Sequence, residues 1–141
     1  MEKYIEAAIK EADKAYDENE VPVGAVIFND DDFLVKARNN KQKENNVIGH
    51  AEINCLKKAA SKRKSWILDD CSILITLEPC LFCLIAIEEA RIRNVYYINS
   101  NAKSGGISEY QKIRNKLKIY KLDTNIEYEN KLKNFFKNKR G

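Results

Sequence analysis

Residues 71–83 read C-S-I-L-I-T-L-E-P-C-L-F-C, and this stretch contains both a strand signal and the start of a helix. Its first seven residues are β-branched or apolar for the most part, which predicts a buried strand. Pro79 ends that strand because proline donates no hydrogen bond to a sheet. A helix over about 80–91 is expected next, with Cys80 and Cys83 spaced i and i+3 on one face. The stretch therefore predicts a strand–turn–helix unit with two thiols at the turn.

Further elements are predicted on both sides of this unit from hydrophobic spacing. They are a helix over 2–18, strands over 21–28 and 33–38, a helix over 50–63, a strand over 95–98 and a final helix over about 126–139. From residue 50 onward helices alternate with strands, which indicates a sheet with parallel members covered by helices. The chain has 141 residues, 44% of them apolar, and no internal repeat or linker. We expect a single domain over 1–141.

Several protein classes are not expected from the composition. The first ten residues, M-E-K-Y-I-E-A-A-I-K, lack the apolar run of a signal peptide. No stretch approaches the 18 apolar residues that a membrane span requires. These features predict a cytoplasmic protein that does not enter a membrane. Four cysteines in such a protein indicate metal binding or catalysis rather than disulfides.

Charge is distributed unevenly along the chain. Residues 1–101 carry 14 basic and 17 acidic side chains, whereas residues 102–141 carry 11 basic and four acidic ones. A basic tail on an acidic body is typical of a protein that binds a polyanion such as RNA. The same bias, with 19 Lys, 15 Asn and 16 Ile, also fits AT-rich codon usage without selection for binding. Both interpretations of the tail stay open at this point.

A second stretch, G-H-A-E-I-N-C at 49–55, holds the single histidine of the chain. His50, Cys80 and Cys83 together form the protein half of a catalytic zinc site, which uses three protein ligands, whereas a structural site uses four. Because residues i and i+2 do not face each other within a helix, His50 should precede the helix if Glu52 addresses the same metal. Glu52 would then move protons rather than bind the ion.

Other interpretations of these residues are possible. A Cys-x-x-Cys pair after a strand also occurs in thioredoxin-like redox proteins, although no proline follows Pro79 to face it. A non-catalytic zinc module that binds RNA is another alternative, and Glu52 argues against it. A closed structural site would need a fourth ligand, from Cys55 or Cys71. Cys55 lies five residues after His50, about 500° around a helix, and so should point elsewhere. We expect both of these cysteines to be buried and inert.

With these motifs in view, the chain resembles the bacterial tRNA-specific adenosine deaminases of the cytidine-deaminase-like superfamily, over essentially its whole length. H-A-E at 50–52 and T-L-E-P-C-x-x-C at 76–83 match the superfamily's metal and proton-shuttle motifs. E-V-P-V-G-A-V at 20–26 resembles the family's first strand. Three softer matches favour the adenosine branch: Asn39, A-K-S-G at 102–105, and the basic aromatic last helix. The chain departs from the family at Asn46-Val47-Ile48-Gly49, Phe82 and Ser100-Asn101.

The resemblance implies an α/β fold of three layers, α/β/α, around a central mixed sheet of five strands. It implies hydrolytic deamination of adenosine to inosine at the wobble position of a tRNA anticodon, with one Zn²⁺ per subunit. The metal ligands would be His50, Cys80 and Cys83, and Glu52 would be the catalytic residue. Substrate contacts would come from Asn39, Val23, Gly24, Ala25, Ala51, Lys103, Phe135 and Phe136.

Two further expectations follow from the same resemblance. The protein should form a homodimer, and its partner should be a tRNA anticodon loop. The nearest alternative is a deaminase of a free base or nucleotide, of the guanine, cytosine or deoxycytidylate type. The H-A-E and P-C-x-x-C motifs alone do not separate these substrates.

Overall fold

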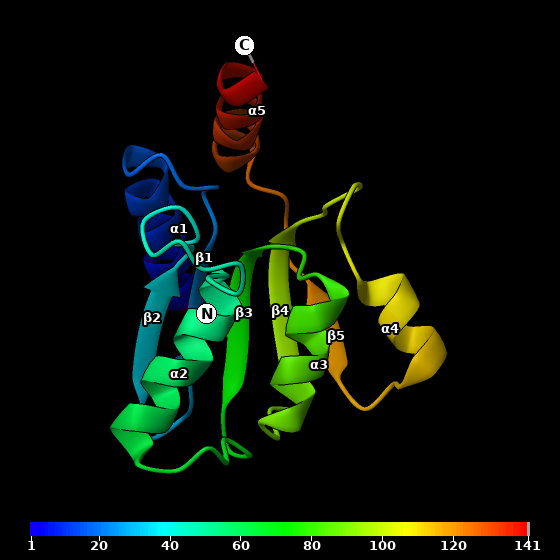
Figure 1. Ribbon diagram of the computed structural model, residues 1–141. Coiled ribbons are helices and arrows are strands. Elements are labelled where there is room, and N and C mark those ends of the chain that lie inside the picture. Colours follow the sequence, from blue (N-terminus) through cyan, green and yellow to red (C-terminus); the bar gives the residue numbers. More distant parts are fainter. Residues whose placement is uncertain (141) are drawn as a thin grey trace.

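Five strands form one mixed sheet in the computed structural model, which describes the backbone of residues 1–140 and the side chains of residues 1–138 (Figure 1). In chain order the elements are α1 (Glu2–Asp17), β1 (Gly24–Phe28), β2 (Leu34–Arg38), α2 (Ala51–Arg63), β3 (Ser72–Leu77), α3 (Leu81–Glu89), β4 (Asn94–Asn99), α4 (Ile107–Ile113), β5 (Lys118–Lys121) and α5 (Ile126–Arg140).

The strands follow the order β2-β1-β3-β4-β5 across the sheet. Strand β1 is antiparallel to both of its neighbours, and Ala25 pairs with Ile75 of β3 at the centre. Strands β3, β4 and β5 run parallel, and α3 and α4 connect them as crossover helices. Parallel neighbours require such crossovers because a tight turn cannot join them. The prediction of a mixed sheet of five strands is confirmed.

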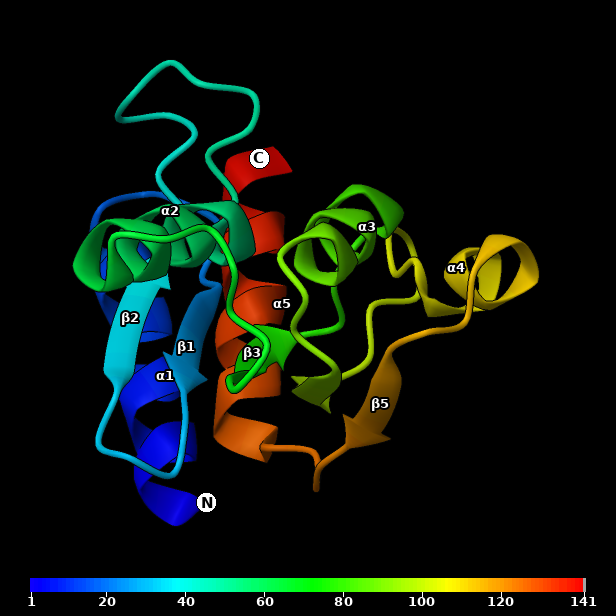
Figure 2. The ribbon, with the colours of Figure 1, turned by 90° about the horizontal axis from the view of Figure 1, so that it is seen from below.

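Helices cover both faces of the sheet, as Figure 2 shows from below. The larger hydrophobic cluster joins the sheet to α2, α3 and α4, and its fully buried members include Ile73, Ile75 and Leu84. A second cluster joins the other face to α1 through Ala8 and Leu74. Such burial of apolar side chains on both faces is the main source of stability for a layered α/β fold. The expected three-layer α/β/α arrangement is confirmed.

The last helix lies beside α1 and buries only one of its sides. Tyr128 and Leu132 of α5 pack with Ala12 of α1, while Ile126 at the start of α5 is exposed. The residues of α5 are polar on average, as expected for a surface helix with one apolar stripe. Among the helices of residues 1–140, none combines the length and the apolar character needed to cross a bilayer.

Two elements were not predicted from the residues alone. Helix α4 has only seven residues, of which Tyr110 alone is buried, and β5 has four residues with no fully buried side chain. Elements this short and this exposed carry almost no periodic signal. Strand β1 also begins later than expected, at Gly24, because Pro22 lacks the N–H that a strand would use.

Candidate metal centre and active site

A cavity of about 260 Å³ opens at the edge of the sheet where β2, β3 and β4 end and where α2 and α3 begin. Six separate segments of the chain line it, so the sheet brings together residues from far apart in the sequence. The lining residues are Val21, Val23, Asn39, Lys41, His50, Ala51, Glu52, Leu77, Glu78, Cys80, Asn101, Ser104 and Phe136.

Three potential metal ligands meet at the inner end of this cavity. His50 and Cys80 occupy the N-cap positions of α2 and α3, each with an extended backbone, and Cys83 lies in the first turn of α3. The His50 Nδ1 atom lies 3.5 Å from the Cys83 sulfur and 4.0 Å from the Cys80 sulfur. All three donor atoms fall within 4.8 Å of one another. The structure thus brings together the two sequence motifs that hold the expected ligands.

The donor set and its spacing fit a zinc ion. Donors at the usual zinc–nitrogen and zinc–sulfur distances of a tetrahedral site stand roughly 3.5–3.8 Å apart. The observed separations from His50 to the two sulfurs surround that range. One imidazole and two thiols are also the ligand types that zinc prefers. The residues present could therefore hold zinc with little movement.

Cys55 and Cys71 lie away from this cluster. The buried Cys55 thiol donates toward the backbone oxygens of Val35 and Ala25, and burial raises its pKa far above the ordinary range. Burial likewise raises the pKa of Cys71 to about 11, and its thiol contacts Asp70. Within the described residues, the metal-binding group therefore contains three donors rather than four. Three donors are typical of a catalytic site.

The electrostatics of the cluster favour a cation. A hydrogen bond from Cys83 lowers the pKa of Cys80 to about 4. A hydrogen bond with Cys80 raises the pKa of His50. The pKa of Cys83 is also raised, first by its hydrogen bond with Cys80 and then by burial. In this arrangement the thiols and the imidazole share protons around one thiolate. A divalent metal would displace those protons and neutralise the cluster, which couples metal binding to proton release.

Glu52 lies beside the ligands without being one of them. It occupies the first turn of α2, is 4% exposed, and lines the cavity together with His50. Burial raises the pKa of its carboxyl group. A buried carboxyl group with a raised pKa can both accept and return a proton near neutral pH. This is the environment that a general acid–base group requires.

Gly49 allows the loop before His50 to pack tightly. No glycine of the described chain has a positive φ, so Gly49 is not needed for a left-handed backbone. A Cβ atom at this position would instead lie 2.6 Å from the Asn40 side chain and 3.0 Å from the backbone of Lys41. The close approach of these segments fixes the entry of the chain into α2.

The expected substrate contacts fall into three groups. Asn39, Val23, Ala51 and Phe136 line the cavity. The Asn39 side-chain oxygen accepts a hydrogen bond from the Lys41 backbone N–H, so the amide NH₂ is the group that it offers to a ligand.

Gly24 and Ala25 are not among the described residues that line the cavity. A Cβ atom on Gly24 would meet the Ala8 backbone oxygen at 2.0 Å, so this glycine lets α1 approach the sheet. Ala25 is completely buried in the core. Their position in the V-G-A segment serves packing.

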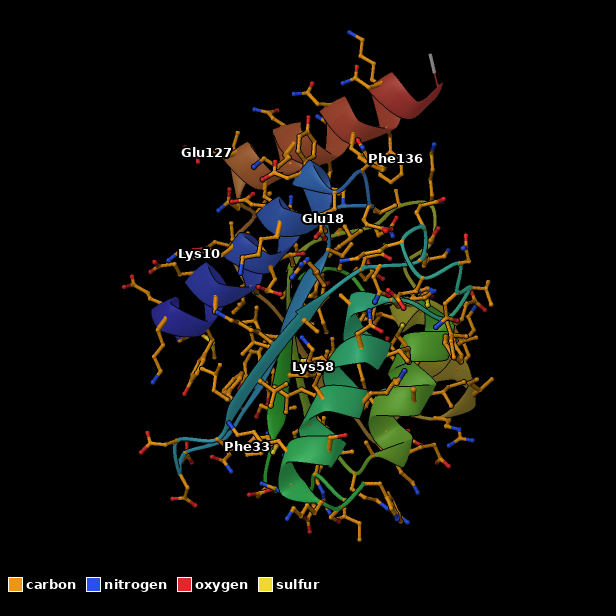
Figure 3. The ribbon with its side chains drawn as sticks, turned by 60° about the vertical axis from the view of Figure 1, so that its left-hand side comes forward. Lys10, Glu18, Phe33, Lys58, Glu127 and Phe136 are labelled. Atoms are coloured by element: carbon orange, nitrogen blue, oxygen red, sulfur yellow. The ribbon has the colours of Figure 1, made fainter. Side chains whose placement is uncertain are left out.

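Lys103, Phe135 and Phe136 lie around the last helix. Lys103 and Phe136 line a second cavity of about 620 Å³. It adjoins the first, and the two share four wall residues, Leu77, Asn101, Ser104 and Phe136. Phe136 is 43% exposed and projects from α5 (Figure 3), whereas Phe135 is 9% exposed and packs against Tyr16 of α1. The two neighbouring rings thus have different surroundings.

Sequence reasoning did not identify two apolar wall residues, Val21 and Leu77, and four polar ones, Lys41, Glu78, Asn101 and Ser104. Glu78 lies inside the T-L-E-P-C motif, directly after β3, and that position at a strand end was an available signal. Asn101 and Ser104 belong to a loop without periodicity. Their role in the wall depends on tertiary contacts that no local pattern specifies.

Comparisons with known proteins agree with this geometry. The family profile of the MafB19-like deaminases matches residues 1–140. A tRNA-specific adenosine deaminase of Rickettsia felis is 40% identical over 105 residues, which cover 73% of each chain. Across five of the curated tRNA-specific adenosine deaminases that the chain matches, the aligned region spans 64–73% of their length.

Solved structures give the same fold. A structure from a study of A-to-I editing by tRNA:A34 deaminases at the wobble position of transfer RNA has a TM-score of 0.79 and 30% identity. That likeness covers 85% of this chain and 97% of the other. A guanine deaminase from Nitrosomonas europaea has a TM-score of 0.78 at 14% identity, covering 94% of this chain and 82% of the other, which shows the fold alone. The chain therefore belongs to the MafB19-like deaminase family and to the family of the tRNA-specific adenosine deaminases.

Proposed function

We propose that the chain is a zinc-dependent hydrolase that converts adenosine to inosine at the wobble position of a tRNA anticodon, with residues 1–141 as one deaminase domain. The observation that carries the proposal is the buried Glu52 carboxyl group beside the His50, Cys80 and Cys83 donors, in a member of this family. A metal cluster without a buried acid–base group would suit binding, whereas the pair suits hydrolysis.

One Zn²⁺ per chain would be held by His50, Cys80 and Cys83. When bound, zinc lowers the pKa of water and so supplies a nucleophile near neutral pH. Glu52 would take a proton from the attacking water and deliver it to a ring nitrogen of the base. The water oxygen would form a bond to the carbon that bears the amine. Glu52 would then take the remaining proton of the added hydroxyl group and deliver it to that amine, so that the carbon–nitrogen bond breaks as the carbon–oxygen double bond forms. The products are inosine and ammonia, so all atoms are accounted for.

Asn39 would orient the base in the cavity. Because its oxygen is held by the Lys41 backbone N–H, its NH₂ group would donate to an acceptor nitrogen of the purine ring. Val23 and Ala51 offer small apolar walls on which the base can rest. This combination of apolar walls and one fixed polar group is typical of small-ligand sites.

The RNA on either side of the target base would lie along α5 and the adjoining loop. Lys103, Lys133, Lys137 and Phe136 line the second cavity, which opens next to the first. Lysines can pair with phosphates, and an exposed aromatic ring can stack on an unpaired base. We also propose a cytoplasmic location, where a tRNA substrate would be found, and a homodimer, which would let one RNA contact two subunits.

The experiment is an ammonia-release assay that offers the zinc-loaded protein either a tRNA transcript or free guanine. Release from tRNA but not from guanine supports the proposal. Release from guanine alone would assign the chain to the free-base deaminases, whose fold it shares. A Glu52→Gln variant in the same assay ties any release to this cavity.

A further inference from the structure

Glu78 joins the metal-ligand turn to the loop that forms the outer wall of the cavity. It follows β3 directly and precedes Cys80 by two residues, and its side chain is half-buried in the cavity lining. Its backbone N–H donates to the Asn99 oxygen at the end of β4 over 2.8 Å. Glu78 thus stands where β3 and β4 both end and the loop over 100–106 begins.

The Glu78 carboxylate accepts two backbone hydrogen bonds from the ends of this loop. One comes from the Asn101 N–H at 3.2 Å and goes to Oε1. The other comes from the Ile107 N–H at 3.4 Å and goes to Oε2. Ile107 is the first residue of α4, and the helix has no side-chain cap of its own at Gly106. The carboxylate therefore closes the loop by holding its first and last parts at once.

Two adjacent glycines let the loop lie directly on this turn. A Cβ atom on Gly105 would lie 2.3 Å from the Glu78 Oε2 atom. A Cβ atom on Gly106 would lie 2.1 Å from the Leu81 nitrogen and 2.6 Å from the Cys80 carbonyl carbon. The Gly106 N–H also donates to the Pro79 oxygen at 2.9 Å. The loop is therefore packed against the backbone of a candidate metal ligand with no room for a side chain.

We infer that Glu78 is a positioning residue, whose carboxylate holds the loop over 100–106 against the Cys80 turn. The loop supplies Asn101 and Ser104 to the walls of both cavities, so its position sets the width of the entrance between them. Glu78 would act through the loop rather than on the reacting atoms. The expected effect of Glu78 on RNA binding rests on the proposed function. The expected role of Glu78 in holding the loop does not.

The test measures amide hydrogen exchange and tRNA kinetics on the same variants. In Glu78→Ala, exchange at the Asn101 and Ile107 amides should speed up by about tenfold, because a hydrogen bond to a charged group is lost. Glu78→Gln keeps one acceptor oxygen and should protect only one of the two amides. KM for tRNA should rise about tenfold in the alanine variant, with a smaller change in kcat, while zinc content and Tm hold.

Glu109→Gln is the matched control, since Glu109 lies on α4 and pairs with the exposed Lys112. It should change neither the exchange at Asn101 nor KM. Unchanged exchange in Glu78→Ala would overturn the inference, even if KM rises, since Glu78 would then contact RNA itself. Faster exchange together with an unchanged KM would show that loop position does not govern RNA binding. If exchange is faster in Glu78→Ala but the parent protein does not deaminate tRNA, the proposed function is refuted. The inference that Glu78 holds the loop over 100–106 would still stand.

Discussion

At the starts of α2 and α3, residues close together in the sequence define the reactive groups. On α5, contacts with other elements decide which side chains face the cavities. At the metal centre, His50 and Glu52 are two residues apart, and Cys80 and Cys83 are three apart, so two short motifs define every reactive group. On α5, Phe135 packs into the body while Phe136 lines the cavities, although the two are adjacent. The proposed catalytic groups are thus set by short motifs, and the proposed substrate contacts on α5 by the way this helix packs against α1.

The contacts of α5 explain this division. Tyr128 accepts a hydrogen bond from Thr76 of β3 at 2.9 Å and donates one to the Pro22 oxygen at 2.6 Å. Lys131 pairs with Asp13 of α1 on the same side of the helix. Residues spaced three or four apart along this side are therefore committed to the body. Lys133 and Lys137 lie on the other side, at the second cavity. The side chains of Lys139 and Arg140 lie outside the described part of the chain.

The largest expected effect is at Glu52. In Glu52→Gln the amide cannot shuttle protons, so kcat for tRNA deamination should fall by about 10²–10⁴-fold. Zinc content and tRNA affinity should hold because the substitution preserves size and leaves the three donors intact. Single-turnover kinetics measures the effect, with Glu89→Gln, an exposed residue at the end of α3, as the control. Turnover close to that of the parent would assign the proton transfer to another group.

Substitution of a proposed metal ligand should lower the zinc content, whereas substitution of another cysteine should not. Cys83→Ser should lose most of its zinc, as measured by elemental analysis, because a hydroxyl group is a poor ligand beside one thiolate and one imidazole. Cys55→Ala should keep about one zinc per chain, since its thiol faces the Val35 backbone. Full zinc retention in Cys83→Ser would contradict the proposed ligand set.

Substitution of Phe135 should lower the stability of the protein, whereas substitution of Phe136 should weaken tRNA binding. Phe135→Ala removes a buried ring and should lower the free energy of unfolding by about 3 kcal/mol. Phe136→Ala removes an exposed ring and should leave Tm nearly unchanged while it raises KM for tRNA. Thermal unfolding and steady-state kinetics on both variants check this. Equal losses of stability would show that the two rings do not differ as described.

The smallest effect is expected from the lysines of α5. A Lys133→Ser, Lys137→Ser double variant should bind tRNA more weakly, and its logarithmic salt dependence should be shallower by about 1.4, or roughly 0.7 per phosphate contact. Binding titrations between low and moderate salt give this slope. A Lys10→Ser, Lys57→Ser double variant is the control, because both lysines are exposed, one on α1 and the other on α2. An identical slope in both double variants would mean that this side of α5 does not contact RNA.

The sequence predicted the sheet and the motifs well because both depend on local patterns. The strand at 72–77 and the two cysteines after Pro79 follow from period and spacing within a dozen residues. Helix α4 and strand β5 could not be predicted in this way, because they are short and exposed. The wall residues Asn101 and Ser104 could not be predicted either, because their positions arise from contacts between distant segments. Phe135 shows the same limit, because only the position of Tyr16 on α1 explains its burial.

Sequencing of a tRNA transcript after incubation with the zinc-loaded protein tests whether the chain deaminates adenosine at the wobble position. Inosine pairs as guanosine, so the adenosine at this position should be read as guanosine with the parent protein. Glu52→Gln should leave that position read as adenosine under the same conditions. An unchanged read with a zinc-loaded, folded parent, across transcripts that carry adenosine at this position, would contradict the account.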